Sequence, residues 1–130
     1  MTLESDLFLF LKQDSILAGY LNERIYPMTL PQGVVLPALT YQRVADIRSY
    51  NMEEADGCVE ARIQIDTWAP KYITMKRIVQ RIMDLLNGLR SGMGSTPVLG
   101  VFLEVGTELF EDEPKIYRSM LDFRFIYHEN

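Results

Sequence analysis

Two aspartates stand where paired carboxylates could act as a general acid and a general base. Asp66 and Asp122 each fall in the middle of a predicted strand, on the side that carries polar residues. If their strands were neighbours, the two carboxylates would face one site. General acid–base catalysis also needs a pocket that shifts a pKa, and the sequence shows none. Because Arg62, Arg118 and Arg124 lie on the same polar sides, and cross-strand charge pairs are ordinary on sheets, salt bridges are favoured over catalysis.

Other residue types that could do chemistry are sparse. The chain has one cysteine, Cys58, and one histidine, His128, which excludes the usual zinc ligand sets. A Cys–His catalytic pair would require the C-terminal tail to fold back. Residues 92–96 (Gly-Met-Gly-Ser-Thr) resemble a phosphate loop, but they lack its lysine and follow a helical pattern instead of opening one. We therefore predict no catalytic residue, metal or cofactor.

The charge balance limits the classes of partner. The chain of 130 residues has 13 basic and 18 acidic side chains, a net charge of −5. With no run of Lys or Arg, this argues against nucleic-acid binding as the main role. The N-terminus is acidic where a signal peptide would be basic, and the apolar run Leu7–Leu11 is too short to span a bilayer. We expect one domain over residues 1–130, made in the cytoplasm and not bound to a membrane.

The elements that must position these residues are arranged around a strand that runs into a helix. Residues 59–68 alternate apolar and polar side chains, the period of a strand with two unlike faces. From Ala69-Pro70 onward, apolar residues recur at three and four positions as far as Leu89, which predicts one face of a helix of roughly 20 residues. Pro70 suits the first helical turn. The sheet is expected to pack on this helix.

Two predicted hairpins supply the sheet. The first joins Ala38–Tyr50 to Val59–Trp68, and the second joins Val98–Leu109 to Ile116–Tyr127. Their tips are acidic, with Glu53, Glu54 and Asp56 in the first and Glu111, Asp112 and Glu113 in the second. The second tip lacks the spaced ligands of a calcium loop, so a solvated turn is favoured.

The N-terminal part is predicted to be helical and then extended. Thr2 and Asp14 are suited to cap two short helices, and prolines in residues 24–37 favour an ordered, extended crossover that could include an edge-strand segment. The sequence thus predicts an α+β fold: a mostly antiparallel, four-stranded sheet of two hairpins, with the long helix and an N-terminal helical segment packed on it. Such hairpins and such an arm are typical of an interaction protein. Trp68 could be a binding hot spot or could simply cover the end of the helix core.

Several short motifs resemble one known family over nearly the whole chain. They are Arg24-Ile25-Tyr26-Pro27, Leu30-Pro31-Gln32-Gly33, the run from Leu36 to Gln42, the run from Gln64 to Ala69, Tyr117-Arg118, and Leu121-Asp122-Phe123. In this order and spacing they resemble the tail completion, or head-to-tail joining, proteins of long-tailed bacteriophages. The two hairpin tips are more acidic than expected of a generic member, which leaves open the neighbour that each one contacts.

The resemblance implies a structural protein of the virion and not an enzyme. It implies a ring, expected to be a hexamer, at the head-proximal end of the tail tube, where it stops tube growth and docks onto the head connector. The implied partners are other copies of the chain, the tail tube protein and the connector, and DNA could pass through the ring. The residues predicted to make these contacts are Glu53, Glu54, Asp56, Glu111, Asp112, Glu113, Arg24 and Tyr26.

Two alternatives remain at the level of sequence. One is another ring or connector protein of the phage neck. The other is a small α+β ligand-binding domain or enzyme, which would have a deep pocket lined by Asp66, Asp122 or Trp68.

Overall fold

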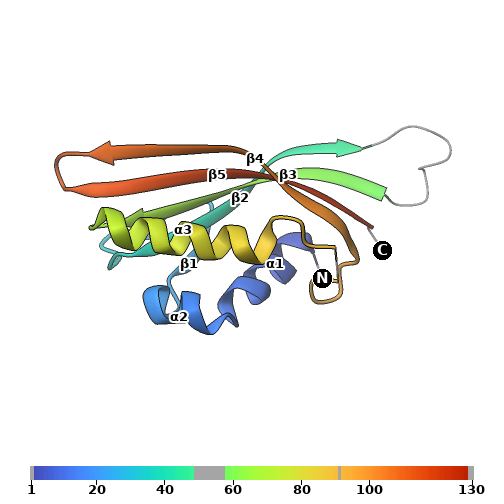
Figure 1. Ribbon diagram of the computed structural model, residues 1–130, viewed down its shortest axis with the longest axis horizontal. Helices are drawn as coiled ribbons and strands as arrows, with labels where there is room; N and C mark the ends of the chain where they lie inside the picture. The colour runs from blue at the N-terminus through green and yellow to red at the C-terminus, as the bar shows by residue number, and fades with distance from the viewer. Residues whose placement is uncertain (1, 49–57, 91, 129–130) are drawn as a thin grey trace.

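A computed structural model of the chain describes residues 2–48, 58–90 and 92–128 (Figure 1). It confirms an α+β fold in which helices cover one face of a sheet. The elements are α1 (Leu3–Lys12), α2 (Ser15–Leu21), β1 (Ile25–Pro27), β2 (Ala38–Arg48), β3 (Cys58–Ala69), α3 (Tyr72–Leu86), β4 (Val98–Glu111) and β5 (Ile116–His128).

The sheet has five strands in the order β1-β2-β3-β5-β4. The strands of each predicted hairpin pair antiparallel, β2 with β3 and β4 with β5, and β3 and β5 join the two pairs. The prediction of four strands was wrong, because β1 adds a fifth strand at the edge of the sheet, parallel to β2. Leu39 donates its N–H to the carbonyl of Arg24 (3.0 Å), and Met28 donates to that of Tyr41 (2.9 Å). Because β1 has only three residues, it is too short to show an alternating pattern.

Helix α3 is shorter than predicted, with 15 residues. Pro70 lies before the helix and not in its first turn, because β3 continues in extended conformation to Ala69 and Lys71 is the N-cap. At the other end, Gly88 has a positive φ of 83° and donates its N–H to a β4 carbonyl 2.8 Å away. That hydrogen bond directs the chain towards the sheet, so Leu89 lies beyond the helix.

The core lies between one face of the sheet and the three helices, which all cover that face in Figure 1. The predicted period of two holds along β3 and β5, whose inward side chains are buried. Fully burying a Phe or Ile side chain stabilises a fold by about 1.5–3 kcal/mol. The buried residues of β3, α3 and β5 in this core include Ala61, Ile63, Ile65, Met75, Ile78, Ile82, Leu121, Phe123 and Phe125.

Strand β2 departs from strict alternation at a bulge. Strict alternation would place Arg43 and Ala45 on one side of the strand. The register shifts between them, so that Arg43 lies opposite Ile63 and Ala45 lies opposite Arg62. The extra residue, Val44, therefore moves Ala45 onto the face that no described helix covers. No glycine or other local signal marks this bulge in the sequence.

Candidate interaction surfaces

The two aspartates singled out by the sequence lie on the open face of the sheet, on neighbouring strands. Asp66 on β3 is 5% exposed. It accepts hydrogen bonds from Arg118 Nη2 on β5 at 2.6 Å and from the Gln64 amide at 2.9 Å. Asp122 on β5 is paired with Arg62 on β3, whose Nε lies 3.3 Å from Oδ1. The preference for salt bridges is confirmed, because each carboxylate is paired with an arginine of the neighbouring strand.

The same face carries a third arginine and the only tryptophan. Arg124 is paired with Glu60 (2.9 Å) and Glu104 (2.7 Å), and its hydrogen bond to Glu60 is the main cause that raises the pKa of Arg124. The Arg118 guanidinium stacks 4.1 Å from the Trp68 ring centroid. Trp68 therefore shields the Asp66 ion pair on the open face. It does not cover the end of the helix core, as one prediction had it.

A shallow hollow lies on the open face near these residues. It has a volume of about 150 Å³ and is lined by Gln64, Val105, Thr107, Met120 and Asp122. Ligand pockets usually measure about 300–1,000 Å³. Neither Asp66 nor Trp68 lines this hollow, and Asp122 is already paired with Arg62. The geometry thus gives little support to a catalytic pair of carboxylates.

The loop that resembled a phosphate site binds a carboxylate of its own chain. Ser95 Oγ donates to Asp6 Oδ2 at 3.2 Å, and Thr96 Oγ1 donates to the same oxygen. A Cβ on Gly94 would lie 2.6 Å from Asp6 Oδ1, so the glycine is required for this close approach. The two hydroxyls that a phosphate would need are engaged, and the loop anchors α1.

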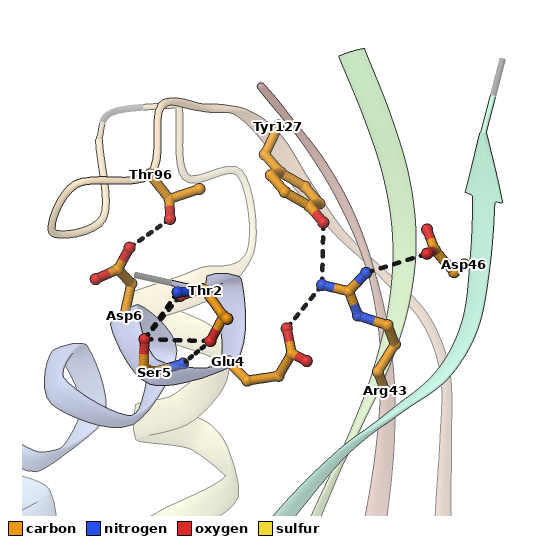
Figure 2. Close-up of polar contacts among 8 residues, drawn as sticks. All are labelled: Thr2, Glu4, Ser5, Asp6, Arg43, Asp46, Thr96 and Tyr127. Atoms are coloured by element: carbon orange, nitrogen blue, oxygen red, sulfur yellow. Dashed lines mark hydrogen bonds and ion pairs between the residues drawn. The ribbon is translucent and has the colours of Figure 1, made fainter. Parts of the chain in front are cut away.

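A second anchor holds α1 against the sheet (Figure 2). Arg43 Nη2 on β2 donates to Glu4 of α1 at 2.7 Å and to the Tyr127 hydroxyl of β5 at 3.0 Å. Asp46 lies 3.4 Å from the other terminal nitrogen of Arg43. Sequence reasoning gave Arg43 and Asp6 no such role. No local signal could reveal it, because Arg43 is 39 and 84 residues from its two partners.

The chain also contributes no cluster of three or more metal-ligating side chains within the described residues. Over the same residues, no helix has both the length and the apolar character needed to cross a bilayer.

The residues predicted to contact partners lie at two separated edges of the sheet. Arg24 is half-buried beside β1, where it donates to the carbonyls of Pro37 (2.8 Å) and Tyr20 (3.2 Å), and Tyr26 is half-buried within β1. The acidic residues of the second hairpin are exposed at the opposite edge, at the end of β4 and in the turn that follows. These are Glu111, Asp112 and Glu113. Glu53, Glu54 and Asp56 lie outside the described residues.

Sequence reasoning missed an aromatic cluster next to the second tip. Phe110 and Tyr117 have ring centroids 4.7 Å apart, and Tyr72 packs edge-on against Tyr117 at 5.6 Å. Tyr72 and Phe110 remain 46% and 49% exposed. Glu108 joins this end of β4 to α3 through Lys76, at 2.8 Å. The proximity of an exposed apolar cluster to three acidic residues is typical of a protein-binding surface.

The described residues define an α+β protein with a helix-covered face and an open face of paired charges. The chain belongs to the family of the tail completion protein gp17, whose sequence profile matches residues 5–128. Membership of this family confirms the resemblance found in the sequence and assigns the protein to the structural components of bacteriophage virions.

A solved structure supports the fold. A chain in the "Virion of native gene transfer agent (GTA) particle" superposes with a TM-score of 0.75 and 15% identity. The match covers 98% of this chain and 95% of that chain. No curated protein matches the sequence.

Proposed function

We propose that this protein caps the head-proximal end of a phage tail tube as a ring and joins the tube to the head connector. The observation that carries the proposal is the match to the tail completion family over residues 5–128. The fold supports it, because the surfaces left open are sheet edges and an acidic, aromatic hairpin tip, which suit assembly better than catalysis.

A closed ring requires two different patches on every subunit, since each copy contacts one neighbour on either side. The two edges of the sheet meet this requirement. One edge presents β1 with Arg24 and Tyr26, and the other presents β4 with the acidic tip. The net charge of −5 would keep isolated subunits apart until a tail end templates their assembly. A hexameric ring would leave an opening through which DNA passes.

The hairpin tips are proposed to contact the neighbouring rings. Glu111, Asp112 and Glu113 would face basic groups on the connector or the tail tube, with the aromatic cluster at Tyr72 and Phe110 supplying apolar contact. The acidic residues 53–56 of the first hairpin are proposed to dock in the same manner.

The decisive test is negative-stain imaging of the protein mixed with tails that lack their head-proximal cap. We expect added density at one end of each tail, and restored joining when heads are supplied. Density on the head connector in the absence of tails would instead favour a neck ring protein. A protein that binds neither structure would contradict both versions of the proposal.

Deleting residues 53–56 tests the first hairpin separately. We expect the deletion to reduce head–tail joining while the melting temperature stays unchanged, because Asp and Glu side chains are rarely part of a hydrophobic core. A parallel fall in melting temperature would show that these residues support the fold instead.

A further inference from the structure

Strand β4 has an open outer edge of unusual character. Within residues 2–48, 58–90 and 92–128 it pairs only with β5, and its register is continuous from Val105 to Glu111. Soluble proteins usually protect such an edge with lysines, prolines, short strands or a covering element. Between Val98 and Glu111 the sequence has no Lys, Arg or Pro. The backbone groups of this segment are therefore available to another strand.

The charges on β4 do not protect its edge either. Of its three glutamates, Glu104 is paired with Arg124 and Glu108 with Lys76, both within the same chain, and the exposed Glu111 is the last residue of the strand. The open-face side chains Phe102, Val105 and Leu109 are apolar and 40%, 52% and 46% exposed. An exposed, regular and largely apolar strand edge of this kind is suited to strand addition.

The opposite edge of the sheet, β1, lies level with this segment. β1 has three residues and ends in Pro27, and its Ile25 N–H donates to the Glu23 carbonyl, so its outer side offers carbonyl acceptors and no free N–H donor. The N–H groups of β4 would therefore supply the donors of a contact between the two edges.

Pair by pair, one row of residues crosses the whole sheet through Tyr26, Thr40, Asp66, Met120 and Thr107. Residues directly opposite one another share a face, so Tyr26 on β1 and Thr107 on β4 both lie on the open face. Tyr26 and Thr107 therefore stand at the two ends of the same row, one on each outer strand.

The directions of the outer strands are compatible as well. β1 is parallel to β2, and three antiparallel pairings separate β2 from β4, so β1 and β4 run in opposite directions. A second copy rotated about an axis along the strands would place its β1 antiparallel to β4, with the helices of both copies on the same side of the sheet.

Charge complementarity identifies a second copy as the occupant of the edge. Arg24 directly precedes β1, and among the described residues its guanidinium has carbonyl acceptors but no carboxylate partner. The neighbouring row of cross-strand pairs runs from Ile25 on β1 to Glu108 on β4. Going back along β1 to Arg24 therefore corresponds to going forward along β4 towards Glu111. Arg24 and Glu111 thus lie at the same end of the sheet. Edge pairing would bring this cation beside the acidic tip.

We propose that the outer edge of β4, residues 105–111, pairs antiparallel with β1 of a second copy, so that one sheet continues from subunit to subunit. This inference rests on the proposed function, since it names the contact that builds the ring. It also gives the two sets of contact residues complementary roles, with Arg24 and Tyr26 on one side of each junction and the acidic tip on the other.

Cysteine cross-linking tests this contact. In a Cys58→Ser background, which removes the only native thiol, we would make Tyr26→Cys together with Thr107→Cys. Val105→Cys and Leu109→Cys, each again with Tyr26→Cys, sample registers shifted by two residues on the same face. A disulfide requires Cα atoms about 4.4–6.8 Å apart. The proteins are oxidised while they are bound to tail ends. We expect one cysteine pair to give a ladder of covalent oligomers larger than the dimer, and we expect each single-cysteine variant to form no cross-link.

The outcomes separate this inference from the proposed function. Tails that gain a cap with no ladder in any register would overturn the edge pairing and leave tail capping intact. A ladder in a protein that never caps tails would support the edge and contradict the capping role. Dimers from Thr107→Cys alone would overturn the β4–β1 contact, because they require β4 to pair with itself about a two-fold axis.

A charge variant gives independent evidence. Val105→Lys with Leu109→Lys adds edge-protecting charges at exposed positions, so it should abolish oligomers on tails while leaving the melting temperature unchanged. The matched control is Ile16→Lys with Ile73→Lys, which adds two lysines at apolar helix positions that are 49% and 55% exposed and should retain oligomers. Equal loss in both variants would indicate a general charge effect and contradict the assignment of the edge.

Discussion

The two faces of the sheet exclude water by different means. On the covered face, helices bury apolar side chains such as Ile63 and Phe123, which are 0% exposed. On the open face, Asp66 is nearly as buried, at 5%, although no described helix covers it. Its own neighbours Arg118 and Trp68 shield it. The covered face therefore holds the fold together through apolar burial, whereas the open face is stabilised by charge pairs between its own strands.

The largest expected effect comes from the covered face. Phe123→Ala removes a fully buried ring and should lower the free energy of unfolding by about 3–5 kcal/mol, from lost transfer energy and a cavity. Urea denaturation measures this change. Phe102→Ala, on the neighbouring strand but 40% exposed on the open face, is the control and should cost less than about 1 kcal/mol. Equal losses would contradict the difference between the faces.

The next effect tests the shielded ion pair. Arg118→Met leaves the Asp66 carboxylate, whose side chain is 7% exposed, without its counter-charge, and should cost about 1–3 kcal/mol in urea denaturation. Arg62→Met breaks a more exposed pair and should cost at most about 1 kcal/mol. Adding Asp66→Asn to Arg118→Met should recover much of the loss. A double variant as unstable as the sum of the single ones would show that the two groups are not coupled.

A smaller effect concerns an ion pair within the helical layer. Asp14 caps α2 through the Leu17 N–H (3.0 Å) and binds Arg81 of α3 through two hydrogen bonds at 3.0 and 2.7 Å. The hydrogen bond from Arg81 is the main cause that lowers the pKa of Asp14. Its folded-state pKa lies below the unfolded value, so the pair stabilises the protein above pH of about 4 and loses this effect as pH falls through the folded pKa.

Arg81→Met should therefore lower the melting temperature at pH 7, and the difference from the unmodified protein should shrink as pH falls below about 4. Thermal melts from pH 7 to pH 3 measure this convergence. A difference that stays constant over this range would mean that Arg81 acts through packing and not through the charge of Asp14.

The smallest effect on stability should accompany a large effect on assembly. Asp112→Lys in the exposed turn should change the free energy of unfolding by no more than about 0.5 kcal/mol and should reduce head–tail joining, measured by counting joined particles. Asp84→Lys, exposed on α3, makes the same change in net charge and should leave joining intact. Impaired joining in both would point to net charge and not to the hairpin tip.

Much of the fold and part of the site could be read from local patterns. The capping roles of Thr2 and Asp14 are confirmed by the side-chain oxygen of each, which accepts an N–H of the first turn. The arginine–aspartate pairs were foreseen, because opposite charges alternate on strands that must lie close together. The partners in each pair were not, since Arg62 and Asp122 are 60 residues apart, and only the register of β3 against β5 joins them.

The sequence alone determined which segments become helices and strands, which faces turn inward, and the family to which the chain belongs, because these depend on the spacing of neighbouring side chains. Tertiary structure decided the rest. It placed β1 as a fifth strand, ended α3 through a hydrogen bond from Gly88, and introduced the bulge after Arg43. It also gave Asp6 and Arg43 their anchoring roles. These features depend on contacts between residues far apart in the chain, and such contacts form only when the whole sheet is in register.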